Sequence, residues 1–269
     1  MPRTIKHKQS GFTLVELVMV IILLGVIGTF SSRFISDNVI LYQTSVNQNE
    51  RLNDARFVLN RMSKELDSAI AFSVTRMPTI VGQTCIQFVP FSAAGQYLGT
   101  VSGKSSVSLI MDKKTRDLAD PSNNDFEGQY ISILTTDANE FDSLPSDTIA
   151  EITKYERVSG ANPAQAEVTL DSTLLKDSAV SRYFIAGSKV QYCLAQIGGV
   201  TRLSRREALL GNSFGTSVLM ADNLTTDSSM SLTGATQFSN AILELSFGFL
   251  LHDGRDIKFE HQVVMTNVP

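Results

Sequence analysis

The chain has 269 residues, of which 43% are hydrophobic, and 23 Lys and Arg residues stand against 27 Asp and Glu residues. This length is enough for one large domain or two small ones, and the apolar content excludes a disordered chain. The acidic balance gives no electrostatic case for a nucleic-acid partner. Three His and two Cys residues leave little material for a metal cluster or a histidine-based active site.

The N-terminal region separates into a basic leader and an apolar segment. Residues 1–11 carry Arg3, Lys6 and Lys8 and no acid, whereas between residues 9 and 32 the one charged side chain is Glu16. As a helix, residues 12–30 would be about 28 Å long at ~1.5 Å per residue. Because a bilayer core is roughly 30 Å thick, this segment predicts a single membrane span with the basic flank in the cytoplasm.

Glu16 is the anomalous residue of the apolar segment. A carboxylate at the centre of a spanning helix costs about 2.5–3.5 kcal/mol, and a secretory signal peptide has no need of one. The sequence Gly28-Thr29-Phe30-Ser31 is also a poor signal-peptidase site. Cleavage between Gly11 and Phe12 would create an α-amino group four residues before Glu16, and such an amine would provide a cationic partner.

The heptapeptide Gly11-Phe12-Thr13-Leu14-Val15-Glu16-Leu17, behind a basic leader and before an apolar run, resembles the type IV prepilin signal. The resemblance implies cleavage between Gly11 and Phe12 by a prepilin peptidase and N-methylation of Phe12. It also implies that Glu16 pairs with the Phe12 amine of a neighbouring subunit during filament assembly. Other pilin subunits and an inner-membrane assembly platform would be further partners. No enzymatic activity and no catalytic cofactor follow from this resemblance.

Helical periodicity continues beyond the apolar segment. Apolar residues recur at spacings of three and four at Leu52, Ala55, Leu59, Met62, Leu66 and Ala69. No proline occurs between residues 3 and 77. These features predict one helix from about Phe12 to about Phe72, kinked near Gly25 and Gly28. Its amphipathic part, residues 31–72, is expected to pack on the chain's own domain rather than in a free coiled coil.

Residues 73–269 have the pattern of a β-rich domain. Two hairpins are predicted, one turning at Gly198-Gly199 and one at Asp253-Gly254. Further strands are expected at residues 86–91, 105–111, 130–135, 149–155, 167–170, 183–194 and 218–221. The fold class is therefore α+β: a long N-terminal helix packed on an antiparallel β-rich domain that would lie in the periplasm.

Cys85 and Cys193 are the two cysteines of the chain, and the predicted topology places both outside the cytoplasm. This compartment favours a disulfide. Two buried free thiols are the alternative.

The sequence Gly211-Asn212-Ser213-Phe214-Gly215 matches the hydrolase pattern G-x-S-x-G, and Asp222 or Asp227 and then His252 follow in serine-hydrolase order. That motif needs a strand before it and a helix after it, whereas residues 216–221 predict a strand. A small-residue loop is favoured, and a membrane-anchored hydrolase using Ser213 is the remote alternative.

Two sets of residues could contribute metal ligands. His252 and His261 flank the last hairpin turn beside Asp253 and Glu260, but a third ligand is lacking. The acidic turns at residues 117–127 and 137–142 could offer oxygen ligands to Ca²⁺, but neither has EF-hand spacing. We therefore predict solvated loops and no metal site.

Beyond the signal, residues 56–66, 85–90 and the hairpin of residues 190–194 and 203–205 resemble the large minor pilins. The length of the chain is also more typical of a minor subunit than of a repeating major one. Within that group the resemblance is to subunits of mannose-sensitive haemagglutinin (MSHA) pili. A minor pseudopilin of a type II secretion system is the alternative.

Overall fold

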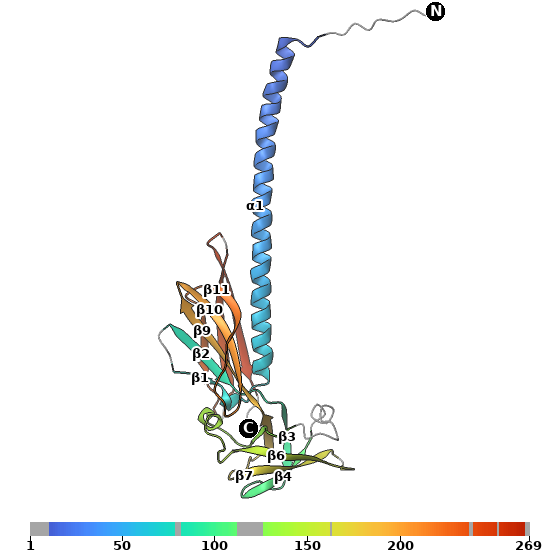
Figure 1. Ribbon diagram of the computed structural model, residues 1–269, viewed down its shortest axis with the longest axis vertical. Coiled ribbons are helices and arrows are strands. Elements are labelled where there is room, and N and C mark those ends of the chain that lie inside the picture. The colour runs from blue at the N-terminus through green and yellow to red at the C-terminus, as the bar shows by residue number, and fades with distance from the viewer. Residues whose placement is uncertain are drawn as a thin grey trace, which may run out of the picture. The chain divides into compact units, whose positions relative to one another are not determined.

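The computed structural model describes residues 11–78, 82–111, 126–161, 163–236, 239–251 and 253–266. The chain divides into two units, Met1–Glu50 and Arg51–Pro269, each of which is described by itself. Helix α1 (Leu14–Asp67) contributes residues to both units (Figure 1).

The helix is close to the prediction but shorter at both ends. It is continuous through Gly25 and Gly28, and it begins at Leu14 and ends at Asp67. The predicted last turn is replaced by the short 3₁₀ helix η1 (Ala71–Ser73), because Ala69 and Ile70 leave the helix to join the β-domain. Ala69 forms an isolated bridge with Pro90, and Ile70 N donates to the carbonyl oxygen of Val89 at 3.0 Å.

The second unit contains an antiparallel sheet that is eight-stranded among the described residues. The strand order is β1-β2-β9-β10-β11-β13-β12, and β14 pairs with β13. The strands span β1 (Thr75–Arg76), β2 (Gln83–Phe88), β9 (Ser188–Ile197), β10 (Val200–Leu209), β11 (Val218–Leu224), β12 (Ser229–Thr233), β13 (Ala241–Leu250) and β14 (Asp256–Met265). Both predicted hairpins are confirmed, as β9–β10 and β13–β14. Gly198 and Gly199 have φ values of 62° and 86°, as a two-residue type I′ turn requires.

The C-terminal part of α1 packs on this sheet. Met62 and Leu66 are fully buried in one core with Phe88 and Tyr192 of β2 and β9 and with Phe247 of β13. The apolar stripe predicted from the spacing of three and four is therefore the face of the helix that meets the sheet.

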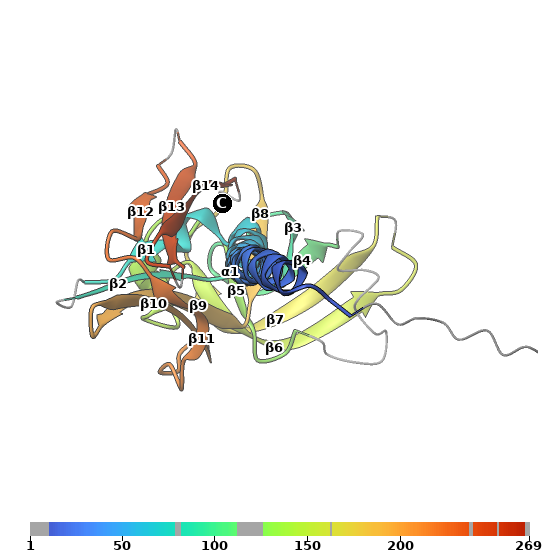
Figure 2. The ribbon, with the colours of Figure 1, turned by 90° about the horizontal axis from the view of Figure 1, so that it is seen from above.

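A second group of strands forms a barrel that the sequence did not predict. It comprises β3 (Ala93–Leu98), β4 (Lys104–Ile110), β5 (Tyr130–Ser132), β6 (Ile149–Val158), β7 (Gln165–Leu174) and β8 (Arg182–Ala186). These strands close in the order β3-β4-β7-β6-β5-β8, and the neighbours β6 and β7 run side by side in Figure 2. The barrel has its own core, which includes Tyr97, Leu109, Ile131, Val168 and Tyr183. In chain order the whole barrel is an insertion between β2 and β9.

The barrel and the sheet share a small junction. Ile70, Val89, Phe141, Phe184 and Leu210 are buried together there. The predicted strand at residues 183–194 is divided at Gly187, where the chain leaves β8 of the barrel and enters β9 of the sheet. A Cβ atom at Gly187 would lie 3.1 Å from Gln129 Cγ, so the crossing point is tightly packed.

Candidate processing and assembly site

The start of α1 is organised by a hydrogen-bonded cap. Glu16 N donates to Thr13 Oγ1 at 3.3 Å, and Thr13 N donates to Glu16 Oε2 at 3.4 Å. This reciprocal pair is a capping box, with Thr13 at the N-cap and Glu16 three residues later. The local sequence signal of this cap is the spacing Thr-x-x-Glu, and the cap was not among the features predicted from the sequence.

The predicted cleavage position lies outside the helix. Gly11, Phe12 and Thr13 have no regular secondary structure, and the Phe12 side chain is 82% exposed. Within the described part of the chain, the Glu16 carboxylate accepts hydrogen bonds only from Thr13. The peptide between Gly11 and Phe12 is thus in a non-helical, exposed segment that a peptidase could bind in extended form.

The helix that follows has an apolar surface on all sides. The side chains of Leu14, Val18, Ile22, Leu23, Val26, Ile27 and Phe30 are all exposed within the unit. By length and composition α1 can cross a membrane, and none of its most apolar window is buried. A helix that is apolar on every side requires lipid or other protein around it.

A family model described as the prokaryotic N-terminal methylation motif matches residues 6–32. No significant match was found among curated proteins or among solved structures. The matched motif is a type IV pilin-like prepilin signal and covers the end of the leader with Lys6 and Lys8, and then Gly11, Phe12 and Glu16.

The motif supports a type IV pilin-like or pseudopilin-like protein, and the exposed apolar helix behind it agrees with that class. The motif implies anchoring by a single N-terminal helix, processing by a prepilin peptidase and assembly with other pilins. It is typical of a structural pilin subunit.

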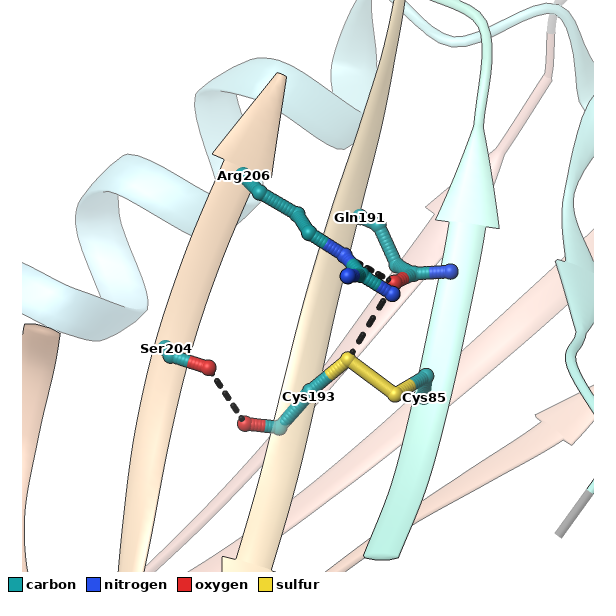
Figure 3. Close-up of a disulfide and its surroundings, with 5 residues drawn as sticks. All are labelled: Cys85, Gln191, Cys193, Ser204 and Arg206. Atoms are coloured by element: carbon teal, nitrogen blue, oxygen red, sulfur yellow. Dashed lines mark hydrogen bonds between the residues drawn. A yellow bond between two sulfur atoms is a disulfide. The ribbon is translucent and has the colours of Figure 1, made fainter. Parts of the chain in front are cut away.

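The predicted disulfide is present. Cys85 of β2 and Cys193 of β9 are directly opposed in the sheet register, with an S–S distance of 2.05 Å (Figure 3). Both cysteines are at least nine-tenths buried, and Gln191 Oε1 lies 3.3 Å from Cys193 Sγ. Arg206 Nε donates to the same oxygen at 2.6 Å. The alternative of two free thiols is therefore wrong.

A polar network joins α1 to the sheet. Arg205 Nε of β10 donates to Glu65 Oε2 at 3.0 Å, and the Tyr192 hydroxyl of β9 donates to the same oxygen at 2.9 Å. Burial, and then the negative charge of Glu65, raise the pKa of Tyr192. Glu65 also accepts from Arg61 Nε of the same helix at 3.1 Å, a contact at helical spacing. Tyr192 and Arg205 lie more than 120 residues away in sequence, so helical spacing alone could not identify these two partners.

Ser213 does not lie in a nucleophile elbow. It is an exposed residue of the connection between the antiparallel strands β10 and β11, with no helix following it. Asp222 Oδ1 lies 3.5 Å from Arg51 Nη1, and Asp227 is exposed. His252 falls outside the described residues. The strand–turn–helix geometry that the motif requires is absent from residues 200–224.

The candidate metal ligands have other partners. His261 Nε2 lies 2.8 Å from Ser63 Oγ, Glu260 pairs with Lys258 and Asp253 pairs with Arg255. Within the described ranges no three His, Cys, Asp or Glu side chains are grouped as a metal site.

Of the two acidic turns, the structure describes the one at residues 137–142 in full. Most of the turn at 117–127 lies outside the described residues. In the other turn, Asp137 caps the 3₁₀ helix η2 (Ala138–Phe141), and Asp142 accepts from Lys189 Nζ at 2.9 Å. Asp142 thus ties the barrel to the sheet.

Proposed function

We propose that this chain is a minor type IV pilin that acts at the initiation or the tip of an MSHA-type pilus, in the manner of the minor pilin MshO. The observation that carries the proposal is the methylation motif at residues 6–32, followed by the exposed apolar part of α1. The resemblance of residues 56–66 and of the β9–β10 hairpin to large minor pilins supports the narrower assignment.

On this proposal residues 1–11 are the leader, and residues 12–30 span the inner membrane and later enter the filament core. Residues 31–72 continue the helix, and residues 73–269 form the periplasmic domain. The prepilin peptidase releases the leader after Gly11, and the new Phe12 amine is methylated. An inner-membrane assembly platform then passes the subunit into the pilus.

Glu16 has two roles in this scheme, and they can be separated. In the free subunit it completes the capping box with Thr13. In the filament it pairs with the Phe12 amine of a neighbour, which offsets the cost of a carboxylate in an apolar environment. Glutamine can also complete a capping box, but it carries no charge.

The test compares Glu16→Gln with Glu16→Ala, scoring leader cleavage by immunoblot and incorporation by quantifying the subunit in sheared pili. We expect both variants to be cleaved largely as wild type and both to be incorporated poorly. Normal incorporation of Glu16→Gln would limit Glu16 to capping and refute the pairing. Failure of cleavage in the wild-type chain would refute the pilin assignment itself.

A minor pseudopilin of a type II secretion system is the second candidate, because the methylation motif supports pilins and pseudopilins alike. Deletion of the gene distinguishes them. Loss of surface pili with intact secretion supports the minor pilin, and loss of secretion with intact pili supports the pseudopilin.

A further inference from the structure

The face of the sheet that points away from α1 holds buried polar side chains around the disulfide. Successive residues of a strand point to opposite faces, and Tyr192 of β9 lies in the core with α1, so Gln191 and Cys193 lie on the other face. Both are 2% exposed, and Gln87 of β2, which pairs with Gln191, is 4% exposed. In an antiparallel sheet the face opposite the core is commonly solvated, so another part of the chain must cover these side chains.

Part of this cover is the connection of residues 211–217 between β10 and β11. Six of its seven residues are exposed, and Phe214 is the exception. The centroid of the Phe214 ring lies 4.9 Å from Arg206 Cζ and 5.3 Å from Lys189 Nζ. Both distances are in the range of cation–π contacts. Phe214 is thus the residue by which this connection is seated on the sheet.

The seat of Phe214 is linked to the disulfide by polar contacts. Arg206 Nε donates to Gln191 Oε1 at 2.6 Å, and the same oxygen lies 3.3 Å from Cys193 Sγ (Figure 3). Lys189 is fixed by Asp142, which accepts from Lys189 Nζ at 2.9 Å. Phe214 therefore rests on two cations that have their own partners, and one of those partners is the amide that lies against the disulfide.

The connection is able to open without unfolding of the sheet. After a turn in which Asn212 N donates to Leu209 O at 3.1 Å, residues 213–217 have no regular structure. Gly211, with a φ of 80°, and Gly215, around which the space is open, lie on either side of Phe214. Glycine gains the most backbone freedom when a segment is released. Exposed segments with few buried contacts open at a lower free energy than the core does.

We propose that residues 211–217 form a gate that controls the access of thiols to the bond between Cys85 and Cys193. Thiol–disulfide exchange requires a thiolate to reach a sulfur atom of the bond. With Phe214 seated, Arg206 and Gln191 are held against the bond and keep the thiolate away. When Phe214 leaves its seat, these side chains move aside, and the uncovered positive charge attracts the thiolate. This inference does not depend on the proposed function.

The test measures reduction of the bond by dithiothreitol in the full-length chain, purified in detergent. One thiolate of the reagent attacks a sulfur of the bond, and its second thiol then resolves the mixed disulfide. The reagent is oxidised to its cyclic disulfide, and Cys85 and Cys193 each receive one electron and one proton. Labelling of the new thiols with a maleimide of high mass gives the rate as a gel shift.

Three substitutions test the role of the ring. Phe214→Ala should be reduced about tenfold faster than the wild type, the order of magnitude that the loss of two cation–π contacts allows. Phe214→Tyr keeps an aromatic ring and should be reduced at the wild-type rate. Phe57→Ala is the matched control, because it removes the same side chain from a position that is 56% exposed on α1. It should leave the rate unchanged.

Urea separates opening of the gate from unfolding of the whole sheet. Opening of a short connection exposes little surface, so the rate of reduction should change little at low urea, whereas reduction through global unfolding rises steeply with urea. Equal or slower reduction of Phe214→Ala would overturn the inference. So would a wild-type rate that follows global unfolding at every urea concentration, or a faster rate in Phe214→Ala that is confined to the urea-dependent range.

Discussion

At the scale of single residues, Glu65 of α1 is a charge that links the helix to two strands of the sheet. Its side chain is 20% exposed and that of Arg205 is 13% exposed, and their contact is shared with Tyr192. Removing Glu65 would leave the buried Tyr192 hydroxyl without this acceptor and Arg205 with the half-exposed Glu207 as its remaining partner. Glu65 therefore adds a polar contact to the apolar packing that holds the last turns of α1 to β9 and β10.

We predict that Glu65→Ala lowers the free energy of unfolding by about 2–4 kcal/mol, since the pair is largely but not fully buried. Denaturant titration followed by circular dichroism measures the change. Glu260→Ala is the control, because Glu260 forms an ion pair on the surface. The Glu260 side chain is 73% exposed and that of its partner Lys258 is 51% exposed. That change should cost less than about 1 kcal/mol. If the two substitutions lowered the free energy of unfolding equally, the Glu65 network would contribute no more to stability than an exposed ion pair.

The same network predicts a dependence on alkaline pH. Burial raises the pKa of Tyr192 in the folded chain, whereas a tyrosine in the unfolded chain ionises at about 10. Above about pH 10 the Tyr192 hydroxyl ionises in the unfolded chain but stays protonated in the folded chain. The contribution of Tyr192 to the free energy of unfolding is therefore complete below about pH 10 and is lost as the pH rises.

Tyr192→Phe should be less stable than the wild type at pH 7, because the hydrogen bond to Glu65 is lost. It should also lose less stability between about pH 9 and pH 11, since residue 192 can no longer ionise. Chemical denaturation at a series of pH values measures both effects. Parallel pH profiles for the two proteins would show that Tyr192 does not contribute to the alkaline loss.

At the scale of elements, the sequence predicted those structures whose signals are local. The helix follows from its spacing of three and four, and the β9–β10 hairpin follows from Gly198-Gly199 between two β-prone runs. The capping box at Thr13 is equally local and could have been predicted. By contrast, β3 contains two alanines and a glycine and shows neither alternation nor β-branched residues.

The barrel could not be predicted because its order depends on non-local pairing. Strand β4 pairs with β7, and β5 pairs with β8, across intervening strands. No single run of residues indicates which distant strand each of these strands pairs with. The contacts of Glu65 with Tyr192 and Arg205 are hidden for the same reason, since each joins the helix to a distant strand.

The buried face of α1 gives a prediction at this scale. Leu66 is fully buried between the helix and the sheet, whereas Asn60 points to solvent. Leu66→Ala should destabilise the chain by about 2–5 kcal/mol through lost burial and the cavity left behind. Asn60→Ala should change stability by less than about 0.5 kcal/mol. Thermal unfolding of both variants checks the difference, and a mild effect at Leu66 would contradict the packing of this helix face.

At the scale of the whole molecule, the disulfide controls the connection between the two parts of the second unit. The barrel begins after β2 and ends before β9, and Cys85 and Cys193 join these two strands directly. The sequence separation of 108 residues encloses every strand of the barrel. When the sheet unfolds, the bond keeps the two ends of the insertion together and restricts the unfolded chain.

We predict that reduction of this bond lowers the free energy of unfolding by about 4–5 kcal/mol, the loop-entropy value for about 100 enclosed residues. Denaturant titration with and without reductant measures the change. The Cys85→Ala, Cys193→Ala double variant should unfold near the midpoint of the reduced wild type and should not respond to reductant, because it has no bond to lose. If reductant leaves the wild-type midpoint unchanged, or if both thiols can be labelled before reduction, the bond does not constrain the insertion.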